Sequence, residues 1–161
     1  MPTSRAFTLM ECLFATTVLA VAALAVAQAV SSGQAQTQAA LGGERAQMLA
    51  QTLMEEVLAL PYADPGGGAV AGPDAGESSR ALFDNADDFH NFSEAAGALR
   101  DHAAVLYPTI FQTYSRQVTA VYGSVTVTGF SAAVPGLTVT VTVTDARGQQ
   151  WSVVRFVPQP L

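Results

Sequence analysis

The hydrophobic pattern begins with a long apolar run near the start of the chain. From Cys12 to Val30 the polar side chains are only those of Thr16, Thr17 and Gln28. A helix of about twenty apolar residues is long enough to cross a bilayer core of roughly 30 Å. Hydroxyl groups are tolerated there because they can donate to the helix's own carbonyls. The run therefore predicts a membrane-spanning helix, and the cation before it, Arg5, places the N-terminus in the cytoplasm.

An amphipathic helix is predicted to follow this run and to end before Pro61, which cannot extend the hydrogen-bond ladder. Apolar residues recur there every three or four positions, which is typical of a helix with one buried face. The expected buried face consists of Ala46, Leu49, Leu53, Val57 and Leu60, widened by Met48, Ala50 and Met54. The expected exposed face consists of Glu44, Arg45, Gln47, Gln51 and Glu55. Because Gly33, Gly42 and Gly43 lower helix propensity, we expect a bend or a locally melted turn between residues 31 and 43.

The middle of the chain is predicted to be irregular, because residues 61–81 contain Gly and Pro at short intervals. Residues 83–94 combine aromatic side chains, which we expect to hold this loop on the folded part, with several acids. Clustered carboxylates are the ligands that Ca²⁺ prefers, but their spacing is not that of an EF-hand loop. We therefore expect a solvated acidic loop at residues 84–94, with no metal and no cofactor.

The last third of the chain is predicted to form four strands, at residues 113–122, 124–130, 137–144 and 150–157. Val and Thr alternate through residues 137–144, which indicates one buried and one solvated face. Asp145 to Gly148 should form the hairpin turn into the last strand. Trp151 is expected to anchor the core or its rim.

Charge and cysteine content exclude several classes of partner and scaffold. The formal net charge is −6, with thirteen acids and with Arg supplying all seven cationic residues. Without a basic stripe, no nucleic-acid binding by charge is expected. The single cysteine, Cys12, cannot form an intramolecular disulfide. His90 and His102 lack metal-ligand spacing and are expected at the surface.

Glu11 is the residue that the membrane-spanning helix does not explain. A carboxylate at the start of such a helix costs a few kcal/mol, so an ionisable group there indicates a function and needs a partner. A cut between Ala6 and Phe7 would create an α-amino group four residues before Glu11. This amine could pair with the carboxylate within one helix or between neighbouring subunits. Ion pairs in apolar surroundings set register better than they add stability.

The sequence around this bond resembles a known processing motif. Arg5-Ala6 followed by Phe7-Thr8-Leu9-Met10-Glu11 is similar to the cleavage and methylation site of type IV prepilins and type II secretion pseudopilins. The resemblance implies that prepilin peptidase cuts between Ala6 and Phe7 and methylates Phe7, and that Glu11 guides assembly. The chain departs from the family in having Ala6 where Gly is usual, which implies slower cutting. Met10 and Cys12 replace branched aliphatic residues.

The resemblance also implies an architecture and a location. The expected α+β pilin fold has a long N-terminal helix, half transmembrane and half amphipathic, packed on a small C-terminal antiparallel sheet. Its parts are a leader (residues 1–6), a transmembrane and assembly helix (7–30), an amphipathic stalk (31–60), a variable αβ-loop (61–112) and the sheet of the head (113–161). The expected location is single-pass in the inner membrane, with a cytoplasmic N-terminus and a periplasmic head. After packing against other pilin or pseudopilin subunits, the chain would lie in a cell-surface pilus or a periplasmic pseudopilus.

Two further segments resemble one branch of the family. Residues 49–62, which end in Pro61-Tyr62, are similar to the helix end of minor pilins of the MshD and PilV kind. Residues 83–90 are similar to an acidic loop with an aromatic residue in MshD-like proteins. A minor pilin that enters or initiates a filament is therefore the favoured function.

Other interpretations remain beside this one. Ala25-Val26-Ala27 matches the cleavage site of an ordinary secretory signal peptide, and a plain signal anchor is a further possibility. The head could belong to a type II secretion pseudopilin, or to a membrane-tethered adhesion or binding module outside any filament. An enzyme is not expected, because the chain has no Lys, no paired His, no Gly-x-Ser-x-Gly and no phosphate-binding glycine loop.

Overall fold

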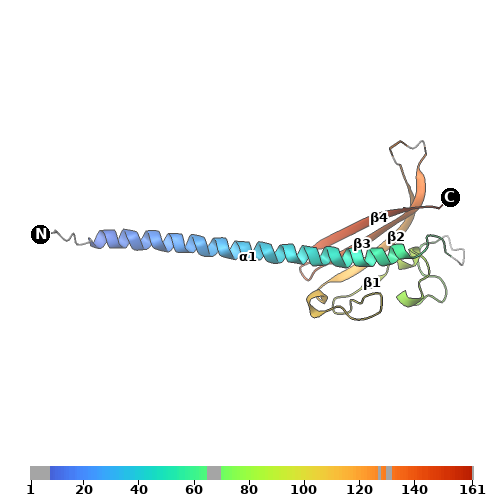
Figure 1. Ribbon diagram of the computed structural model, residues 1–161, viewed down its shortest axis with the longest axis horizontal. Helices are drawn as coiled ribbons and strands as arrows, with labels where there is room; N and C mark the ends of the chain where they lie inside the picture. The colour runs from blue at the N-terminus through green and yellow to red at the C-terminus, as the bar shows by residue number, and fades with distance from the viewer. Residues whose placement is uncertain (1–7, 65–69, 127, 130–131, 161) are drawn as a thin grey trace. The chain divides into compact units, whose positions relative to one another are not determined.

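The computed structural model describes residues 8–64, 70–126, 128, 129 and 132–160. Its long helix is α1 (Leu9–Ala59), and its strands are β1 (Ser93–Glu94), β2 (Ser115–Val125), β3 (Val134–Thr144) and β4 (Gln150–Pro158). Short 3₁₀ helices are η1 (Arg80–Leu82), η2 (Asp87–Phe89) and η3 (Thr109–Phe111). The predicted α+β class is confirmed: a long N-terminal helix and a small antiparallel sheet (Figure 1). By its internal contacts the chain forms two units, Met1–Gly42 and Gly43–Leu161.

The first unit consists, in its described part, of α1 from Leu9 onward. Every described residue before Gly42 is exposed. The hydroxyls of Thr16 and Thr17 donate to the carbonyls of Leu13 and Phe14, at 3.0 and 2.9 Å, as expected for hydroxyls in an apolar helix. The predicted melted turn in residues 31–43 is wrong, because α1 is continuous there, and the bend stays a prediction.

The second unit packs the end of α1 against one face of the sheet (Figure 1). The buried helix residues are Ala46, Leu49, Ala50, Leu53, Met54 and Val57. They meet the inward face of β2 and β3, which contributes Val118, Ala120, Leu137, Val139, Val141 and Val143. The predicted amphipathic stripe is confirmed except at Met48, which is 45 % exposed, and at Leu60, which follows the end of α1 and is only partly buried. Met48 follows Glu44 by four positions, so it lies on the opposite, polar side of the helix.

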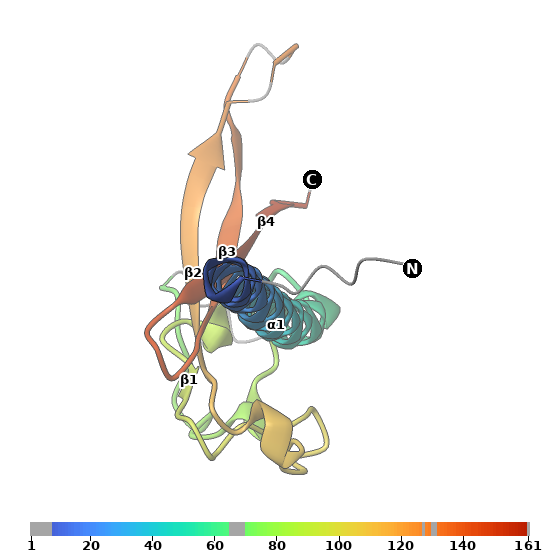
Figure 2. The same cartoon turned by 90° about the vertical axis from the view of Figure 1, so that its left-hand side faces the viewer.

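The sheet is antiparallel, with strand order β1-β2-β3-β4. In place of the two strands predicted at residues 113–122 and 124–130 there is one strand, β2, which runs through Gly123, ends at Val125 and pairs with β3 along eleven residues. The error has a physical reason: Gly123 has no positive φ and lies opposite Gly136 in the ladder, so it does not form a turn. The paired strands β2 and β3 extend beyond the part covered by α1 (Figure 2). The short edge strand β1 was missed inside the predicted loop.

Two glycines in the second unit permit close packing. A Cβ atom at Gly43 would lie 3.4 Å from Nε1 of Trp151, so α1 approaches this ring closely. A Cβ atom at Gly136 would clash with the carbonyl oxygen of Val157 and the ring of Phe156. The expectation that Trp151 anchors the rim of the core is confirmed, since its ring is half-buried against the core.

The acidic loop is built around an aromatic cluster and is not fully solvated. The rings of Phe83, Phe89 and Phe92 pack edge to face, with centroids 5.0–6.2 Å apart. The predicted aromatic anchoring is thereby confirmed. The predicted solvation of the acids is wrong for Asp87 and Asp88, which are 3 % and 1 % exposed. The burial of Asp88 is possible because its Oδ2 accepts the backbone N–H groups at 84 and 85, at 2.9 and 3.0 Å.

Candidate functional site

The sequence-predicted assembly residue, Glu11, lies in the first turn of α1. One of its carboxylate oxygens, Oε2, accepts hydrogen bonds from the backbone N–H of Thr8 at 2.9 Å and from its hydroxyl at 3.1 Å. The N–H of Glu11 in turn donates to the hydroxyl oxygen of Thr8 at 3.3 Å. This reciprocal arrangement is a capping box, which satisfies donors that a helix N-terminus leaves free.

The capping box changes how Glu11 is explained. Its carboxylate has a partner inside its own chain, at a residue that would remain after cutting at the predicted bond. A membrane anchor that enters no filament therefore also has a use for Glu11. The predicted cleavage pair Ala6 and Phe7, with Phe7 as the methylated residue, lies outside the described residues.

The apolar part of α1 is an uncovered surface. Its large apolar side chains are 52–80 % exposed at Leu9, Met10, Leu13, Phe14, Val18, Leu19, Val21, Leu24, Val26 and Val30. Its most apolar window has a mean hydropathy of 2.2, and none of that window is buried. A helix that is apolar on all sides is found in the interior of a large protein or in a membrane. The helix is long and apolar enough to cross a membrane.

In the second unit, three carboxylates gather at the acidic loop. Oxygen atoms of Glu77, Asp84 and Asp88 lie within 4.8 Å of one another, so these residues could hold a hard cation such as Ca²⁺. Among the described residues no other group of three acids, histidines or cysteines is this close. The prediction that no metal binds remains a prediction.

The crowding of carboxylates shifts their ionisation. A hydrogen bond and the negative charge of Asp64 raise the pKa of Asp74 above its ordinary value. The N–H of Asp74 donates to Glu77 and favours its ionised form, but desolvation and the charges of Asp88 and Asp84 outweigh this and raise the pKa of Glu77. Hydrogen bonding to the protonated form, desolvation and neighbouring negative charges all disfavour the ionised form of a carboxyl group.

Burial governs the neighbouring pair. Desolvation raises the pKa of Asp87, and desolvation together with the Asp87 charge raises the pKa of Tyr122 to about 12. Both groups therefore disfavour losing a proton. Oδ1 of Asp87 is buried and has no hydrogen-bond partner among the described residues.

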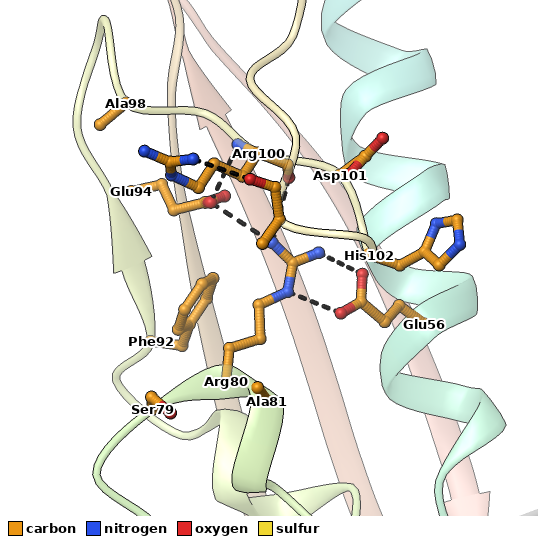
Figure 3. A pocket seen from close by; sticks show the side chains of 11 residues that line it. Glu56, Ser79, Arg80, Ala81, Phe92, Glu94, Ala98, Arg100, Asp101 and His102 are labelled. Carbon is orange, nitrogen blue, oxygen red and sulfur yellow. Dashed lines mark hydrogen bonds and ion pairs between the residues drawn. The ribbon is translucent and has the colours of Figure 1, made fainter.

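A pocket of about 380 Å³ lies beside an ion-pair network in the second unit (Figure 3). Arg80 donates from Nε to Glu56 at 2.6 Å and makes a second contact with the same carboxylate through Nη2. Arg80 also donates from Nη1 to Glu94 at 3.3 Å. Although burial alone would lower the pKa of Arg80, its hydrogen bonds and charge pairing with Glu56 raise it above the ordinary value.

Glu94 is the centre of this network. Its carboxylate accepts from Arg80, from the backbone N–H of Arg100 at 3.1 Å, and from Nε of Arg116. The side chain of Arg116 is fully buried. The two cations and the carboxylates of Glu56 and Glu94 balance in formal charge, and the network joins α1, η1, β1 and β2. Its geometry is that of a structural clamp.

The two histidines differ in their surroundings. His102 is exposed, as expected. His90 is half-buried, and its Nδ1 accepts the N–H of Ala120 at 3.2 Å, so the prediction of a surface residue is wrong for His90. The imidazole caps a strand donor that the two-residue strand β1 does not reach.

Comparisons with known proteins leave the family open. No family model matches this chain, and neither a curated protein nor a solved structure matches it.

Sequence reasoning missed Thr8 and the Glu94 network. The spacing Thr8-x-x-Glu11 is the capping-box signature and could have revealed the first. The second has no local signal, because Glu94 and Arg116 are 22 positions apart and Arg80 and Glu56 are 24 apart.

Proposed function

We propose that this protein is a type IV pilin-like structural subunit, held in the inner membrane by the apolar part of α1 and later incorporated into a filament. In this proposal prepilin peptidase removes residues 1–6 and methylates Phe7, the head lies in the periplasm, and the chain is not an enzyme. A pilus and a type II secretion pseudopilus are the two possible destinations.

The observation that supports this proposal is the contrast along a single helix. From Cys12 to Val30 α1 is almost entirely apolar and exposed throughout, whereas from Ala46 to Val57 its inner face is buried against an antiparallel sheet. A helix that needs an apolar environment at one end and carries a folded head at the other suits a subunit that is stored in a membrane. In a filament, the helices of other subunits would replace the lipid.

The second candidate is a membrane-tethered binding module that enters no filament. The capping box favours it, because Thr8 gives Glu11 a role in forming the helix itself. The two candidates make different demands on Glu11: helix capping needs a hydrogen-bond acceptor, while assembly needs a negative charge opposite the amine at Phe7.

Two measurements on the chain in its native membrane test the proposal. Mass spectrometry of the mature N-terminus should find N-methyl-Phe7; a chain that begins at Gln28 would contradict the proposal. Glu11→Gln keeps an acceptor for Thr8 but removes the charge. It should leave processing intact and abolish co-sedimentation with sheared filaments, whereas Asp74→Asn, which neutralises an exposed acid of the head, should leave co-sedimentation unchanged. Normal co-sedimentation of Glu11→Gln, or none for the unaltered chain, would favour the tethered module.

A further inference from the structure

The head exposes apolar side chains on one loop. Residues 103–110, the apolar loop, carry no charged residue. Val105, Leu106 and Ile110 in it are 60, 49 and 53 % exposed. Figures 1 and 2 show the segment before β2, drawn in yellow to gold, at the opposite end of the sheet from the tip of the β2–β3 hairpin. Exposed apolar side chains that are gathered on one segment, and not scattered singly, are typical of interaction sites.

The apolar loop is held in a defined shape. Oδ1 of Asp101 accepts the N–H groups of Ala103 and Val105, both at 2.9 Å, and the Asp101 N–H donates to the carbonyl of Val105 at 2.9 Å. Nη1 of Arg100 donates to the carbonyl of Ala104 at 2.7 Å. Ala104 adopts a φ of 61°, which is unfavourable for a residue with a Cβ atom and persists only where its surroundings impose it. The loop is therefore preorganised to present its apolar side chains, which lowers the entropy cost of docking.

A second uncovered surface lies on α1 within the same unit. Its exposed side carries a row with alternating spacings of four and three, which we name the outer stripe: Glu44, Met48, Gln51, Glu55 and Leu58. This spacing places the five side chains along one face of a helix. Met48 and Leu58 are 45 and 40 % exposed. No ion pair among the described residues engages Glu44 or Glu55.

The two surfaces are complementary in both apolarity and charge. The apolar loop follows Arg100, an exposed cation that forms no ion pair among the described residues, while the neighbouring Asp101 carboxylate is engaged by the loop's own N–H groups. The outer stripe offers two acids without an ion pair among the described residues, placed between apolar side chains. A lipid surface would match the apolar side chains of the loop but has no reason to match the pattern of the stripe. The chain itself supplies both halves of the contact.

We propose that the apolar loop of one copy docks on the outer stripe of α1 in a second copy. The two patches differ, so the contact is heterologous, and repeating it produces an open helical array and not a closed dimer. The inference rests on the proposed function, because an open array is what a filament subunit needs. It adds the specific head surfaces through which neighbouring copies meet.

Cysteine cross-linking of the full chain in its native membrane tests the contact. All variants carry Cys12→Ala, which removes the native cysteine. One tagged copy carries Val105→Cys in the apolar loop, and a differently tagged copy carries Gln51→Cys in the outer stripe. The matched control replaces Val105→Cys by Val154→Cys on β4, where the native side chain is 52 % exposed.

The expected result is a mixed disulfide dimer of the loop and stripe variants. It should form about tenfold faster than the control pair, because docking raises the effective concentration of the two thiols. Rates equal to the control would overturn the inference. So would a dimer of two Val105→Cys copies in place of the mixed one, because that would indicate a symmetric contact.

A lipid contact is tested in parallel. A fluorophore attached at Val105→Cys should not be quenched by nitroxide-labelled lipids in vesicles; strong quenching would assign the apolar loop to the membrane and overturn the inference. Failure here is distinguishable from failure of the proposed function. Methylated Phe7 and co-sedimentation with filaments would stand without the cross-link if only this contact is wrong. A cross-link without co-sedimentation would support the contact between copies and contradict the proposed incorporation into a filament.

Discussion

Thr8 and Glu11 are joined by three hydrogen bonds at the start of α1, two of them to the same carboxylate oxygen. The pair caps the beginning of α1 with groups of the chain itself. The carboxylate that would serve in assembly is therefore already engaged. An arriving amine from a neighbour would have to compete with Thr8 or share Glu11 with it.

Removing the hydroxyl of Thr8 should loosen the first turn of α1. Thr8→Val keeps the side-chain shape but loses two of the three bonds, which should cost about 1 kcal/mol of local stability. Backbone amides of the first turn should then exchange hydrogen about fivefold faster in detergent micelles, as measured by NMR. Thr8→Ser, which keeps the hydroxyl, is the control. Unchanged exchange in Thr8→Val would show that the backbone N–H alone caps the helix.

Two glycines that face each other across β2 and β3 should respond in opposite ways to the same substitution. Gly136→Ala places a methyl group against the Val157 carbonyl and the Phe156 ring, and should destabilise the fold by about 1–3 kcal/mol. Gly123→Ala is its partner in the ladder and meets nothing within 4 Å. It should be neutral, or stabilising by up to about 1 kcal/mol, since it restricts the unfolded chain. Chemical denaturation of the two variants measures both, and equal losses would contradict the assigned register.

Glu94→Gln should be among the most destabilising single changes in the head. The amide keeps the size of the side chain, but Arg116 stays buried without its counter-charge, and breaking a buried pair costs about 3–5 kcal/mol. Glu55→Gln removes a charge from an exposed position and should change stability by no more than about 0.5 kcal/mol. Unfolding in denaturant, followed by the fluorescence of Trp151, compares the two. A loss for Glu94→Gln as small as the control's would mean that Arg116 reaches water.

The parts of this fold that were predictable share a physical origin. The run from Cys12 to Val30 is recognised by its unbroken apolar length, and the stripe from Ala46 to Val57 by its repeat every three or four residues, so each signal extends over many residues. The end of α1 before Pro61 follows from the chemistry of one residue. The predicted strand break at Gly123 is wrong, because a glycine indicates a turn of this kind only where the backbone has a positive φ. Whether the backbone has one depends on how the strand pairs with its neighbour.

The arrangement of the head loop could not be read from the sequence. Glu94 meets Arg80 and Arg116 only after the chain has folded back, and such contacts leave no trace in local spacing. The burial of Asp88 depends on backbone N–H groups that any residue carries. Side-chain charge alone therefore predicted an exposed position where hydrogen bonding permits a buried one.

Neutralising Asp74, an acid raised in pKa by its neighbour Asp64, should stabilise the head at neutral pH. The pKa of Asp74 is raised from its ordinary 3.8 by Asp64, so the folded chain binds this proton more tightly than the unfolded chain does. The destabilisation caused by ionised Asp74 is therefore absent below the ordinary pKa of 3.8, and it grows as the pH rises from that value through the raised pKa of the folded chain. Asp74→Asn should raise the melting temperature at pH 7 and have little effect at pH 3. Glu44→Gln is the control outside the cluster, and an equal rise in both variants would point to net charge in place of local crowding.

His90 and His102 should differ in their importance for stability. His90→Ala leaves the N–H of Ala120 without its acceptor, and Ala120 is fully buried, so the loss should be about 1–3 kcal/mol. His90→Asn places an amide oxygen near the position of Nδ1 and should recover part of it. His102→Ala removes an exposed side chain of the same type and should change stability by no more than about 0.5 kcal/mol. Thermal melts of the three variants decide the matter: if His90→Asn is no better than His90→Ala, packing and not the hydrogen bond holds His90 in place.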